Sequence, residues 1–357
     1  MPQLKGLILS GGAGTRLRPI THTSAKQLVP VANKPVLFYG VEALVEAGIE
    51  EIGIVIAPET GGEIREAVGD GSAFGAEVTY IEQESPLGLA HALLTAEDYL
   101  ADSRFVMYLG DNLLRDGIVE LVEDFKASGP EALILLTSVP DASAYGVAEL
   151  DGERVVRLIE KPENPPSDLA LVGVYMFSPA IFEAAHSIEP SARGELEITD
   201  AIDALIDGGK RVEPHIVKGW WKDTGRLEDM LEANRLVLED LEERIEGELI
   251  DSQVEGRAVI EKGATLTRCR VRGPAVIASG ARLENAYIGP YTAIGSDVVV
   301  VGSEIEHSIV LAGSRIHDLP ARLERSLLGK DVSLTRSEGM PKTMQFLVGD
   351  NAEIAIP

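Results

Sequence analysis

Hydrophobic positions in the first 225 residues fall into short apolar runs that are separated by segments with helical spacing. The apolar runs predict strands over residues 4–9, 52–56, 105–109, 132–136 and 155–159. Spacings of three and four positions predict helices over residues 36–47, 88–100 and 118–128. This alternation is typical of an α/β fold in which helices flank a mostly parallel sheet. We therefore predict an N-terminal α/β domain over residues 1–225.

The pattern changes after residue 225. Apolar residues at positions 227, 230, 231, 238, 241 and 245 keep a helical spacing, and an asparagine, Asn234, stands in the same row. Acidic residues lie between these positions and are expected to face solvent. Residues 226–250 are thus predicted to form a linker helix.

A repeat of 17 residues begins after Ile250. It aligns aliphatic side chains in three columns, which are Val254, Val271, Ile288, Ile305; Ile260, Ile277, Ile294, Leu311; and Leu266, Leu283, Val300, with Ile316 one residue early. Glycines recur between the columns, at Gly256, Gly263, Gly273 and Gly280. Three short strands per repeat are typical of a triangular parallel β-helix, here of about four coils, and the pattern resembles the left-handed hexapeptide-repeat type. Residues 251–357 are predicted to be this domain, with a further hexad step from Val348 to Ile354 as an extra strand or cap.

A glycine-rich loop follows the first predicted strand. Gly11, Gly12 and Gly14 let the backbone take left-handed angles and bring several N–H groups toward phosphate oxygens, and Arg16 adds a cationic fork. The loop is not a dinucleotide fingerprint, because Leu17 stands where the last glycine belongs, and it lacks the Gly-Lys-Ser/Thr of a P-loop. A turn without a ligand is the alternative interpretation of the glycines alone.

The run from Gly11 to Pro19, followed by Lys26-Gln27-Leu28-Val29-Pro30-Val31 and Lys34-Pro35, resembles the signature of the sugar-1-phosphate nucleotidylyltransferases. Lys26-Gln27-Leu28 is most similar to the branch that transfers thymidylyl groups to glucose-1-phosphate, in its long form with a C-terminal β-helix. The resemblance implies a Rossmann-like N-terminal domain and an enzyme that converts dTTP and glucose-1-phosphate into dTDP-glucose and pyrophosphate, for deoxysugar biosynthesis. It also implies catalytic roles for Arg16 at the leaving pyrophosphate, Lys26 at the triphosphate and Lys161 at the attacking sugar phosphate.

The nucleotide side of the predicted site includes the loop residues Gly11, Gly12, Gly14 and Thr15. Gln83 offers a donor and an acceptor that match the edge of thymine or uracil and mismatch cytosine, so it does not separate dTTP from UTP. The other nucleotide-binding candidates are Gln27, Pro86 and Gly88. For Gly88, a plain turn before a helix stays open as an alternative.

Two aspartates follow predicted strands far apart in the sequence, Asp111 in Leu-Gly-Asp-Asn and Asp223 in Trp-Lys-Asp-Thr-Gly. Two carboxylates can hold Mg²⁺ and leave coordination places for phosphate oxygens. The resemblance implies that these are the metal ligands, with Mg²⁺ as the cofactor. It implies a sugar-phosphate site made of Asn112, Tyr145, Gly146, Glu160, Lys161, Leu171, Val172 and Arg193.

Charge and composition limit the classes of molecule that the chain is expected to bind. The chain has a net charge of −26, which disfavours nucleic acid and anionic membranes as partners. The single cysteine, Cys269, excludes an intrachain disulfide, and no apolar run is long enough to span a membrane. We expect a cytoplasmic homo-oligomer.

Three alternatives remain open from the residues. The chain could be a uridylyltransferase of the same family, or a non-catalytic regulatory protein that binds sugar nucleotides. Acetyl transfer on the β-helix would need a basic histidine in a coenzyme groove, for which His307 and His317 are the candidates. Because the repeat uses its regular positions for inward aliphatic residues, we expect a packing or assembly role for it.

Overall fold

The computed structural model describes residues 4–12, 14–22, 24–336, 348 and 351–355. Its contacts divide the chain into two compact units. The first unit consists of Met1–Ala13, Ser24–Leu28 and Val36–Asp223, and the second of Gly14–Thr23, Val29–Pro35 and Thr224–Pro357. The glycine-rich signature therefore contributes to both units. The predicted domain ranges, which run without interruption along the chain, stay a prediction.

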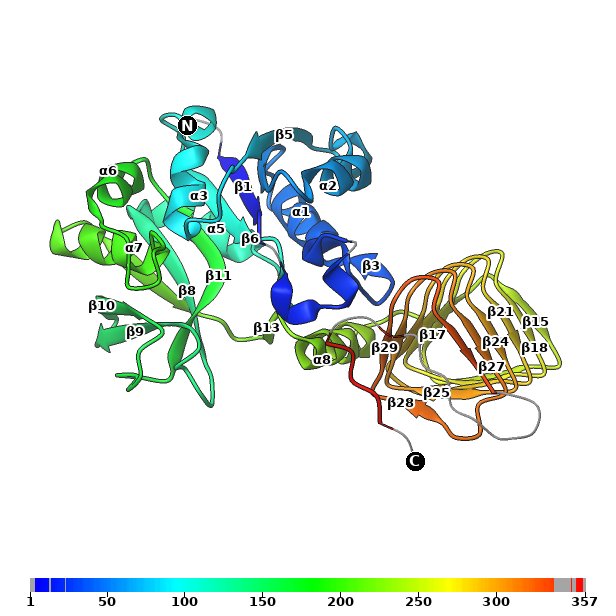
Figure 1. Cartoon of the computed structure of the whole chain (residues 1–357). Helices are drawn as coiled ribbons and strands as arrows, with labels where there is room; N and C mark the ends of the chain where they lie inside the picture. Colours follow the sequence, from blue (N-terminus) through cyan, green and yellow to red (C-terminus); the bar gives the residue numbers. More distant parts are fainter. Residues whose placement is uncertain (1–3, 13, 23, 337–347, 349–350, 356–357) are drawn as a thin grey trace. The chain divides into compact units, whose positions relative to one another are not determined.

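A nine-stranded sheet forms the centre of the first unit (Figure 1). Its strands are β1 (Lys5–Ser10), β4 (Glu51–Ile56), β5 (Glu77–Glu82), β6 (Phe105–Leu109), β8 (Ala132–Ser138), β9 (Gly146–Asp151), β10 (Arg154–Glu160), β11 (Leu169–Phe177) and β12 (Val212–Ile216). They run in the order β10-β9-β11-β6-β1-β4-β5, and β8 pairs with β11 and β12. β1, β4, β5 and β6 are parallel, whereas β11 is antiparallel to β6, β8 and β9. The Rossmann-like class is confirmed, with a more mixed sheet than the apolar runs predict.

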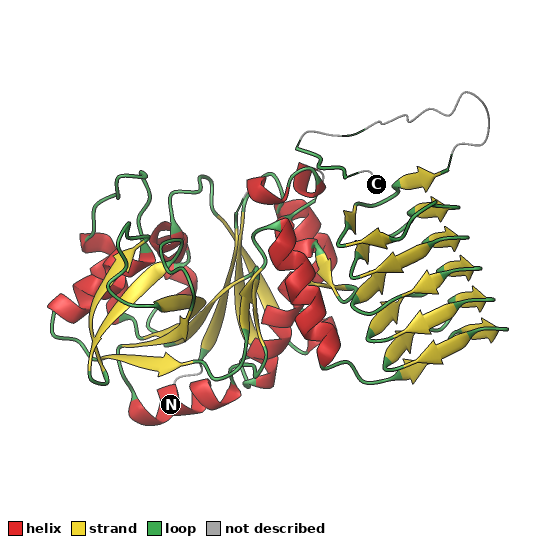
Figure 2. Ribbon diagram, turned by 90° about the horizontal axis from the view of Figure 1, so that it is seen from below, coloured by secondary structure: helices red, strands yellow, loops and turns green. Residues whose placement is uncertain are grey.

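Helices cover both faces of this sheet (Figure 2). Along β1, Leu7 and Leu9 belong to one hydrophobic core and Ile8 to the other, as the alternation of side chains in a strand requires. The first core includes residues of α3 (Leu89–Thr95), α4 (Glu97–Leu100), α6 (Ala180–Ser187) and α7 (Ile198–Asp207). The second includes residues of α1 (Val36–Glu46), α2 (Gly61–Val68) and α5 (Val119–Ser128). The helix predicted over residues 88–100 is interrupted at Ala96 and forms two helices.

Short elements connect these layers. The 3₁₀ helices are η1 (Thr15–Leu17), η2 (Ile20–His22), η3 (Lys26–Leu28) and η4 (Ser72–Phe74). Two small antiparallel ladders are formed by β2 (Pro30–Val31) with β3 (Lys34–Pro35), and by β7 (Asn112–Leu114) with β13 (Trp221–Asp223).

The second unit contains the linker helix α8 (Leu227–Glu239) and a stack of three parallel sheets. The first sheet consists of β14 (Arg244–Ile245), β17 (Ala258–Ile260), β20 (Ala275–Ile277), β23 (Thr292–Ile294), β26 (Ile309–Val310) and β29 (Leu327–Leu328). The second consists of β15 (Glu248–Ile250), β18 (Thr265–Thr267), β21 (Arg282–Glu284), β24 (Val299–Val301), β27 (Arg315–His317) and β30 (Ser333–Thr335). The third consists of β16 (Gln253–Glu255), β19 (Arg270–Arg272), β22 (Tyr287–Ile288), β25 (Glu304–Glu306) and β28 (Leu323–Glu324). The arrangement is consistent with the predicted left-handed β-helix.

The strand register confirms most of the predicted aliphatic columns. Val254, Val271, Ile288 and Ile305 are successive partners, and so are Leu266, Leu283, Val300 and Ile316. In the remaining column Ile294 pairs with Val310, so the prediction of Leu311 is wrong, because that coil is one residue shorter. The stack is also longer than the predicted four coils, since two of its sheets have six strands.

The ends of the repeat differ from the sequence pattern. α8 ends at Glu239, and Arg244–Ile245 already forms the first strand of the stack, so the helix predicted to continue through Ile245 is wrong in its last part. Of the hexad step from Val348 to Ile354, residues 349–350 lie outside the described residues, and the described remainder contains no strand.

Candidate active site

Candidate residues gather where the parallel strands of the first unit end. Gly11 follows β1, Gln83 follows β5, and Asp111 comes two residues after the end of β6. Because β1, β4, β5 and β6 pair in parallel, their carboxyl ends meet at one edge of the sheet. Ligands of open α/β sheets bind at this edge.

The glycine loop lies directly against two of the predicted nucleotide contacts. A Cβ atom built on Gly11 would lie 2.9 Å from Gln83 Oε1, and one built on Gly12 would lie 3.0 Å from Lys26 Cε. Any side chain at these positions would displace the side chains of Gln83 and Lys26. The structure thus brings Gly11, Gly12, Lys26 and Gln83 together.

Lys26 forms an ion pair with Asp111, in which its Nζ donates to Oδ2. Both side chains are mostly buried, with relative exposures of 16% and 13%. Burial alone would raise the pKa of Asp111, but the charge of Lys26 and hydrogen bonds from Lys26 and Asn112 hold that pKa below its usual range. Asp111 is therefore a carboxylate at neutral pH.

The ladder of β7 and β13 brings the second aspartate to the same place. Asp223 pairs with Asn112, the residue next to Asp111. The backbones of Asp111 and Asp223 are thus brought near one another, and two carboxylates are the kind of hard ligand that Mg²⁺ takes together with phosphate oxygens. Within the described part of the chain no cluster of three or more carboxylate, histidine or cysteine side chains could hold a metal. The pair suits a metal whose remaining ligands come from substrate and water.

Asn112 is buried and serves to connect these elements. Its Oδ1 accepts hydrogen bonds from Trp221 Nε1 at 2.5 Å and from the backbone N–H of Gly173 at 3.2 Å, and its Nδ2 donates to Asp111 Oδ1 at 3.1 Å. This side chain, predicted to contact the sugar phosphate, is engaged in orienting Asp111. Its predicted contact with the sugar phosphate stays a prediction.

Gln83 and Gln27 are both buried polar residues at the predicted nucleotide side. Gln83 Nε2 donates to His91 Nδ1 at 2.8 Å, which fixes the orientation of the Gln83 amide. Gln27 is 1% exposed, and its Oε1 has no hydrogen-bond partner among the described residues. A buried acceptor of this kind is costly unless a ligand or water donates to it.

The segment with Pro86 and Gly88 leads into α3. Pro86 is exposed. Gly88 has a φ of 108°, and a Cβ there would lie 2.7 Å from the backbone nitrogen of Leu196 and even closer to its carbonyl oxygen. The close approach of Leu196 is sufficient to require glycine, so the prediction that Gly88 contacts the base stays untested.

The predicted sugar side is a cluster around Glu160, at the end of β10. Lys161 Nζ lies 3.3 Å from Glu160 Oε1, and Thr199 Oγ1 donates to Glu160 Oε2 at 3.3 Å. A Cβ on Gly146 would lie 2.6 Å from Thr199 Cγ2 and 3.3 Å from Glu160 Oε2. The structure therefore brings together Gly146, Glu160, Lys161 and Thr199.

Arg193 borders the same cluster through carboxylates. It donates from Nε and Nη2 to Glu197, which is buried, and its Nη2 lies 2.8 Å from Glu195 and 3.6 Å from Glu160. Leu171 and Val172 are buried in the two opposite cores, and a Cβ on Gly146 would lie 3.3 Å from Leu171 Cδ1. Tyr145 packs edge-on against Trp221, with 5.5 Å between ring centroids.

The remaining candidates belong to the second unit. Gly14 has a φ of 61° and precedes η1, which carries Thr15 and Arg16 with exposed side chains. The Gly14 carbonyl accepts hydrogen bonds from Leu17 N at 3.0 Å and Thr21 Oγ1 at 2.7 Å, which closes the turn. The left-handed turn predicted for the glycine loop is thus confirmed at Gly14.

Sequence reasoning missed four residues that hold these contacts: His91, Glu197, Thr199 and Trp221. His91 is a polar residue among the apolar residues at the start of α3. This exception is a sequence signal that could have identified it. Thr199 and Trp221 bond Glu160 and Asn112, which are 39 and 109 positions away, so these contacts follow only from the fold. Glu197 instead bonds Arg193, four residues earlier.

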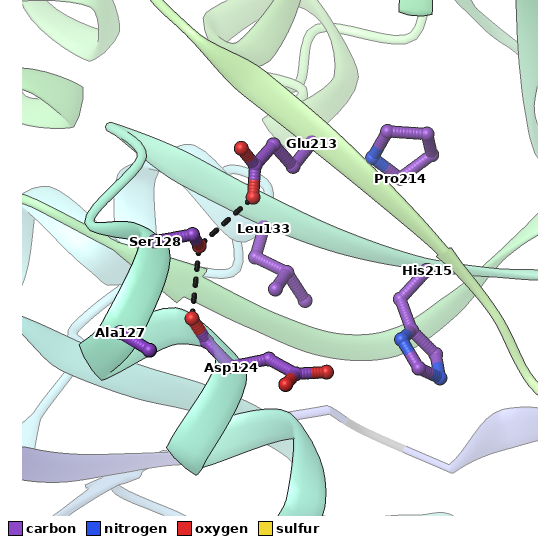
Figure 3. Close-up of a pocket in the computed structure, with 7 residues that line it drawn as sticks. All are labelled: Asp124, Ala127, Ser128, Leu133, Glu213, Pro214 and His215. Carbon is purple, nitrogen blue, oxygen red and sulfur yellow. Dashed lines mark hydrogen bonds between the residues drawn. The ribbon is translucent and has the colours of Figure 1, made fainter. Parts of the chain in front are cut away.

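A hollow elsewhere in the first unit does not suit these substrates. It has a volume of about 250 Å³ and is lined by residues of α5, β8 and β12, which are Asp124, Ala127, Ser128, Leu133, Glu213, Pro214 and His215 (Figure 3). Ser128 Oγ donates to Glu213 at 3.0 Å, and burial lowers the pKa of His215. The two carboxylates would repel an anionic sugar phosphate, and a neutral imidazole supplies no positive charge to offset them.

Comparison with known proteins shows the family of the chain. A family model described as nucleotidyl transferase matches residues 5–240. Proteins named glucose-1-phosphate thymidylyltransferase from Streptomyces antibioticus and Streptomyces griseus are 55% and 53% identical to this chain over 99% of each chain. A crystal structure from Bacillus anthracis, provisionally assigned to the same activity, aligns with a TM-score of 0.63 and 36% identity over 68% of this chain and 98% of that chain. The family predicted from the glycine-rich signature is confirmed, and the chain belongs to the nucleotidyl transferase family.

Proposed function

We propose that this protein transfers a deoxythymidylyl group from dTTP to glucose-1-phosphate and releases pyrophosphate. The observation that carries the reaction class is the pairing of β7 with β13, in which Asp223 is the partner of Asn112, the residue that follows Asp111 of the ion pair with Lys26. The substrates follow from the Streptomyces relatives, which match the chain over nearly its whole length. The product, dTDP-glucose, is a precursor suited to deoxysugar biosynthesis.

In the proposed reaction, a phosphate oxygen of glucose-1-phosphate attacks the α-phosphorus of dTTP. The new P–O bond forms as the bond to the β-phosphate oxygen breaks, and pyrophosphate leaves. A sugar phosphate has a second pKa of about 6 and is largely a dianion at neutral pH, so the reaction needs no general base. The protein's task is to align two anions and to neutralise their charge.

The residues divide this task. Gly11, Gly12, Gly14 and Thr15 offer backbone and hydroxyl donors to the triphosphate, and Lys26 adds a charge that its ion pair with Asp111 holds in place. Arg16 stabilises charge on the leaving pyrophosphate. Gln83, oriented by His91, and Gln27 read the pyrimidine edge. Lys161 and Arg193 hold the sugar phosphate, while Glu160 accepts hydrogen bonds from sugar hydroxyls.

Mg²⁺ is part of this proposal. Asp111 and Asp223 supply the hard oxygen ligands, and the lowered pKa of Asp111 keeps it ionised for that role. When bound, the ion would neutralise charge on the reacting phosphates.

Measured nucleotide preference tests the proposed substrates. We expect the purified chain to use dTTP best, because the two Streptomyces relatives are named thymidylyltransferases. We expect UTP to be accepted less well, as a second pyrimidine-dione that the Gln83 amide matches. The test is a matrix of kcat/KM values for dTTP, UTP, ATP and GTP against several sugar-1-phosphates. A preference for UTP would favour the uridylyltransferase alternative, and a preference for ATP or GTP would contradict the assignment of Gln83. Nucleotide binding without any turnover would support a regulatory protein.

Replacement of Lys161 tests the sugar side. Lys161→Ala is expected to raise the KM for glucose-1-phosphate about 10- to 100-fold, because it removes a charged hydrogen bond to the sugar phosphate. The KM for dTTP is expected to stay within about twofold of the parent value. Steady-state kinetics with each substrate varied in turn provides both values. Lys210→Ala, an exposed lysine of the same unit, is the matched control. An unchanged KM for glucose-1-phosphate in Lys161→Ala would remove Lys161 from the site.

We also propose that this chain forms a homo-oligomer in the cytoplasm. The first coil of the β-helix exposes Ile245, Leu249 and Ile250, and apolar side chains of this kind support contact with another subunit. Among the described residues, no helix has the length and apolar character needed to cross a membrane.

A further inference from the structure

Asn234 is a polar residue in the apolar row of α8. It is fully buried, as are Met230 and Leu238 on the same side of the helix. An amide at such a position is costly unless each of its polar atoms has a partner. Its partners therefore indicate why an asparagine stands there.

The amide of Asn234 joins two parts of the second unit. Its Oδ1 accepts a hydrogen bond from Ala32 N at 2.9 Å, and its Nδ2 donates to the Tyr291 carbonyl at 2.9 Å. Ala32 lies in the turn of the β2–β3 hairpin, and Tyr291 directly precedes β23 of the β-helix. One side chain thus connects the hairpin of the glycine-rich signature to a coil of the repeat.

A second side chain makes the same connection independently. Asn33 Nδ2 donates to the Ile294 carbonyl at 2.7 Å. Ala32 and Asn33 have φ values of 48° and 64°, as in a type I′ hairpin turn, for which asparagine is favoured. The turn is therefore held by its own geometry and by two amides that reach α8 and β23.

The hairpin directly follows a segment that the proposed function assigns to the nucleotide. β2 begins two residues after η3, which carries Lys26 and Gln27, and β3 begins with Lys34. The segment that carries Arg16 is part of the same compact unit as the hairpin and the β-helix. Displacement of the hairpin would change the backbone path that leads from η3.

We propose that Asn234 is a positioning residue for nucleotide binding, which acts together with Asn33 by fixing the signature hairpin to α8 and to the coil at Tyr291–Ile294. The β-helix then helps to set the affinity for dTTP, in addition to any role in packing or assembly. This inference rests on the proposed function, because it takes dTTP as the ligand of the signature.

Two substitutions in the full-length chain separate this role from general stability. Asn234→Leu removes both hydrogen bonds at similar volume, whereas Asn33→Gly keeps the left-handed turn and removes only the bond to Ile294. The matched control is Ser303→Ala, which removes a buried hydroxyl that bonds Val301 and Leu319, both within the β-helix.

We expect both asparagine variants to raise the KM for dTTP about 5- to 20-fold, with the KM for glucose-1-phosphate within about twofold of the parent value. Ser303→Ala is expected to lower the Tm without changing either KM. The effects of Asn234→Leu and Asn33→Gly on the KM for dTTP are expected to be less than multiplicative when combined, because each releases the same hairpin.

If the KM for dTTP in both asparagine variants equals that of Ser303→Ala, although their Tm is lowered, the inference is overturned. Asn234 would then have a structural role alone. If Asn234→Leu does not fold, Asn33→Gly decides the question by the same comparison. A parent chain that does not turn over dTTP and glucose-1-phosphate would overturn the proposed function and this inference together. An active parent with unaffected variants would overturn this inference only.

Discussion

Arg16→Ala is expected to lower kcat about 10²- to 10³-fold, because it removes a fixed positive charge where negative charge develops on the leaving pyrophosphate. Arg16 suits this role because it follows the left-handed residue Gly14 on a single 3₁₀ turn, with its guanidinium exposed. The KM for each substrate should change much less than kcat. Pre-steady-state measurement of pyrophosphate release gives the rate of the transfer step directly.

Arg282→Ala provides the matched control, because Arg282 is an exposed arginine of the same unit within the β-helix. It should retain the parent kcat. Arg16→Lys should recover part of the activity, since a lysine keeps the charge but not the planar fork. Parent-like turnover in Arg16→Ala would disprove the assignment to the leaving group.

Asp111→Asn and Asp223→Asn are each expected to lower kcat at least about 10²-fold, because each removes one of two carboxylates that the proposed Mg²⁺ site contains. The Mg²⁺ concentration for half-maximal activity should rise in both variants. In Asp111→Asn, Lys26 also loses the partner charge of its buried ion pair, so this variant should also lose thermal stability.

Activity measured against Mg²⁺ concentration, together with the Tm without Mg²⁺, separates these effects. Asp151→Asn is the control, since Asp151 is an exposed aspartate at the end of β9. An unchanged Mg²⁺ requirement in Asp223→Asn would contradict its role as a ligand. Isothermal titration of Mg²⁺ in the presence of dTTP reports the same loss without turnover.

Much of the fold follows from the hydrophobic pattern. The strand over residues 105–109 is a continuous apolar run that is buried on both faces. The β-helix columns repeat regularly and bury one face of each strand, which fixes their register. The predicted register fails where the coil shortens before Val310, because Ile309, Val310 and Leu311 are all aliphatic and the pattern does not show which of them faces inward. The antiparallel part of the sheet is not foreseen, since an apolar run predicts a strand but not its direction.

The candidate site is predicted less completely than the fold. Gly11, Gly12, Lys26, Gln83, Asp111 and Asp223 come from motifs, and their grouping follows from the rule that parallel strands end at one edge. The contacts of Asn112 with Gly173 and Trp221 depend on β11 and β13, which are more than 50 residues away. Such contacts carry no local signal in one sequence.

Asn234 is a residue for which the sequence shows an exception but not its structural cause. Its place in an apolar row of α8 is visible in the sequence as an exception. The reason for the exception is a turn about 200 residues earlier, together with the backbone of a β-helix coil, and both become visible only in the folded chain. A polar residue in a buried helical row is thus a useful sequence signal even when its partners are unknown.

The most direct test of the account is product analysis with the purified full-length chain, dTTP, glucose-1-phosphate and Mg²⁺. The account predicts that dTDP-glucose and pyrophosphate appear in equal amounts, and that added pyrophosphate drives dTDP-glucose back to dTTP and glucose-1-phosphate. Phosphorus NMR follows all four compounds in one sample. Hydrolysis of dTTP without a sugar nucleotide, or an absence of both products while dTTP binds, would contradict the account.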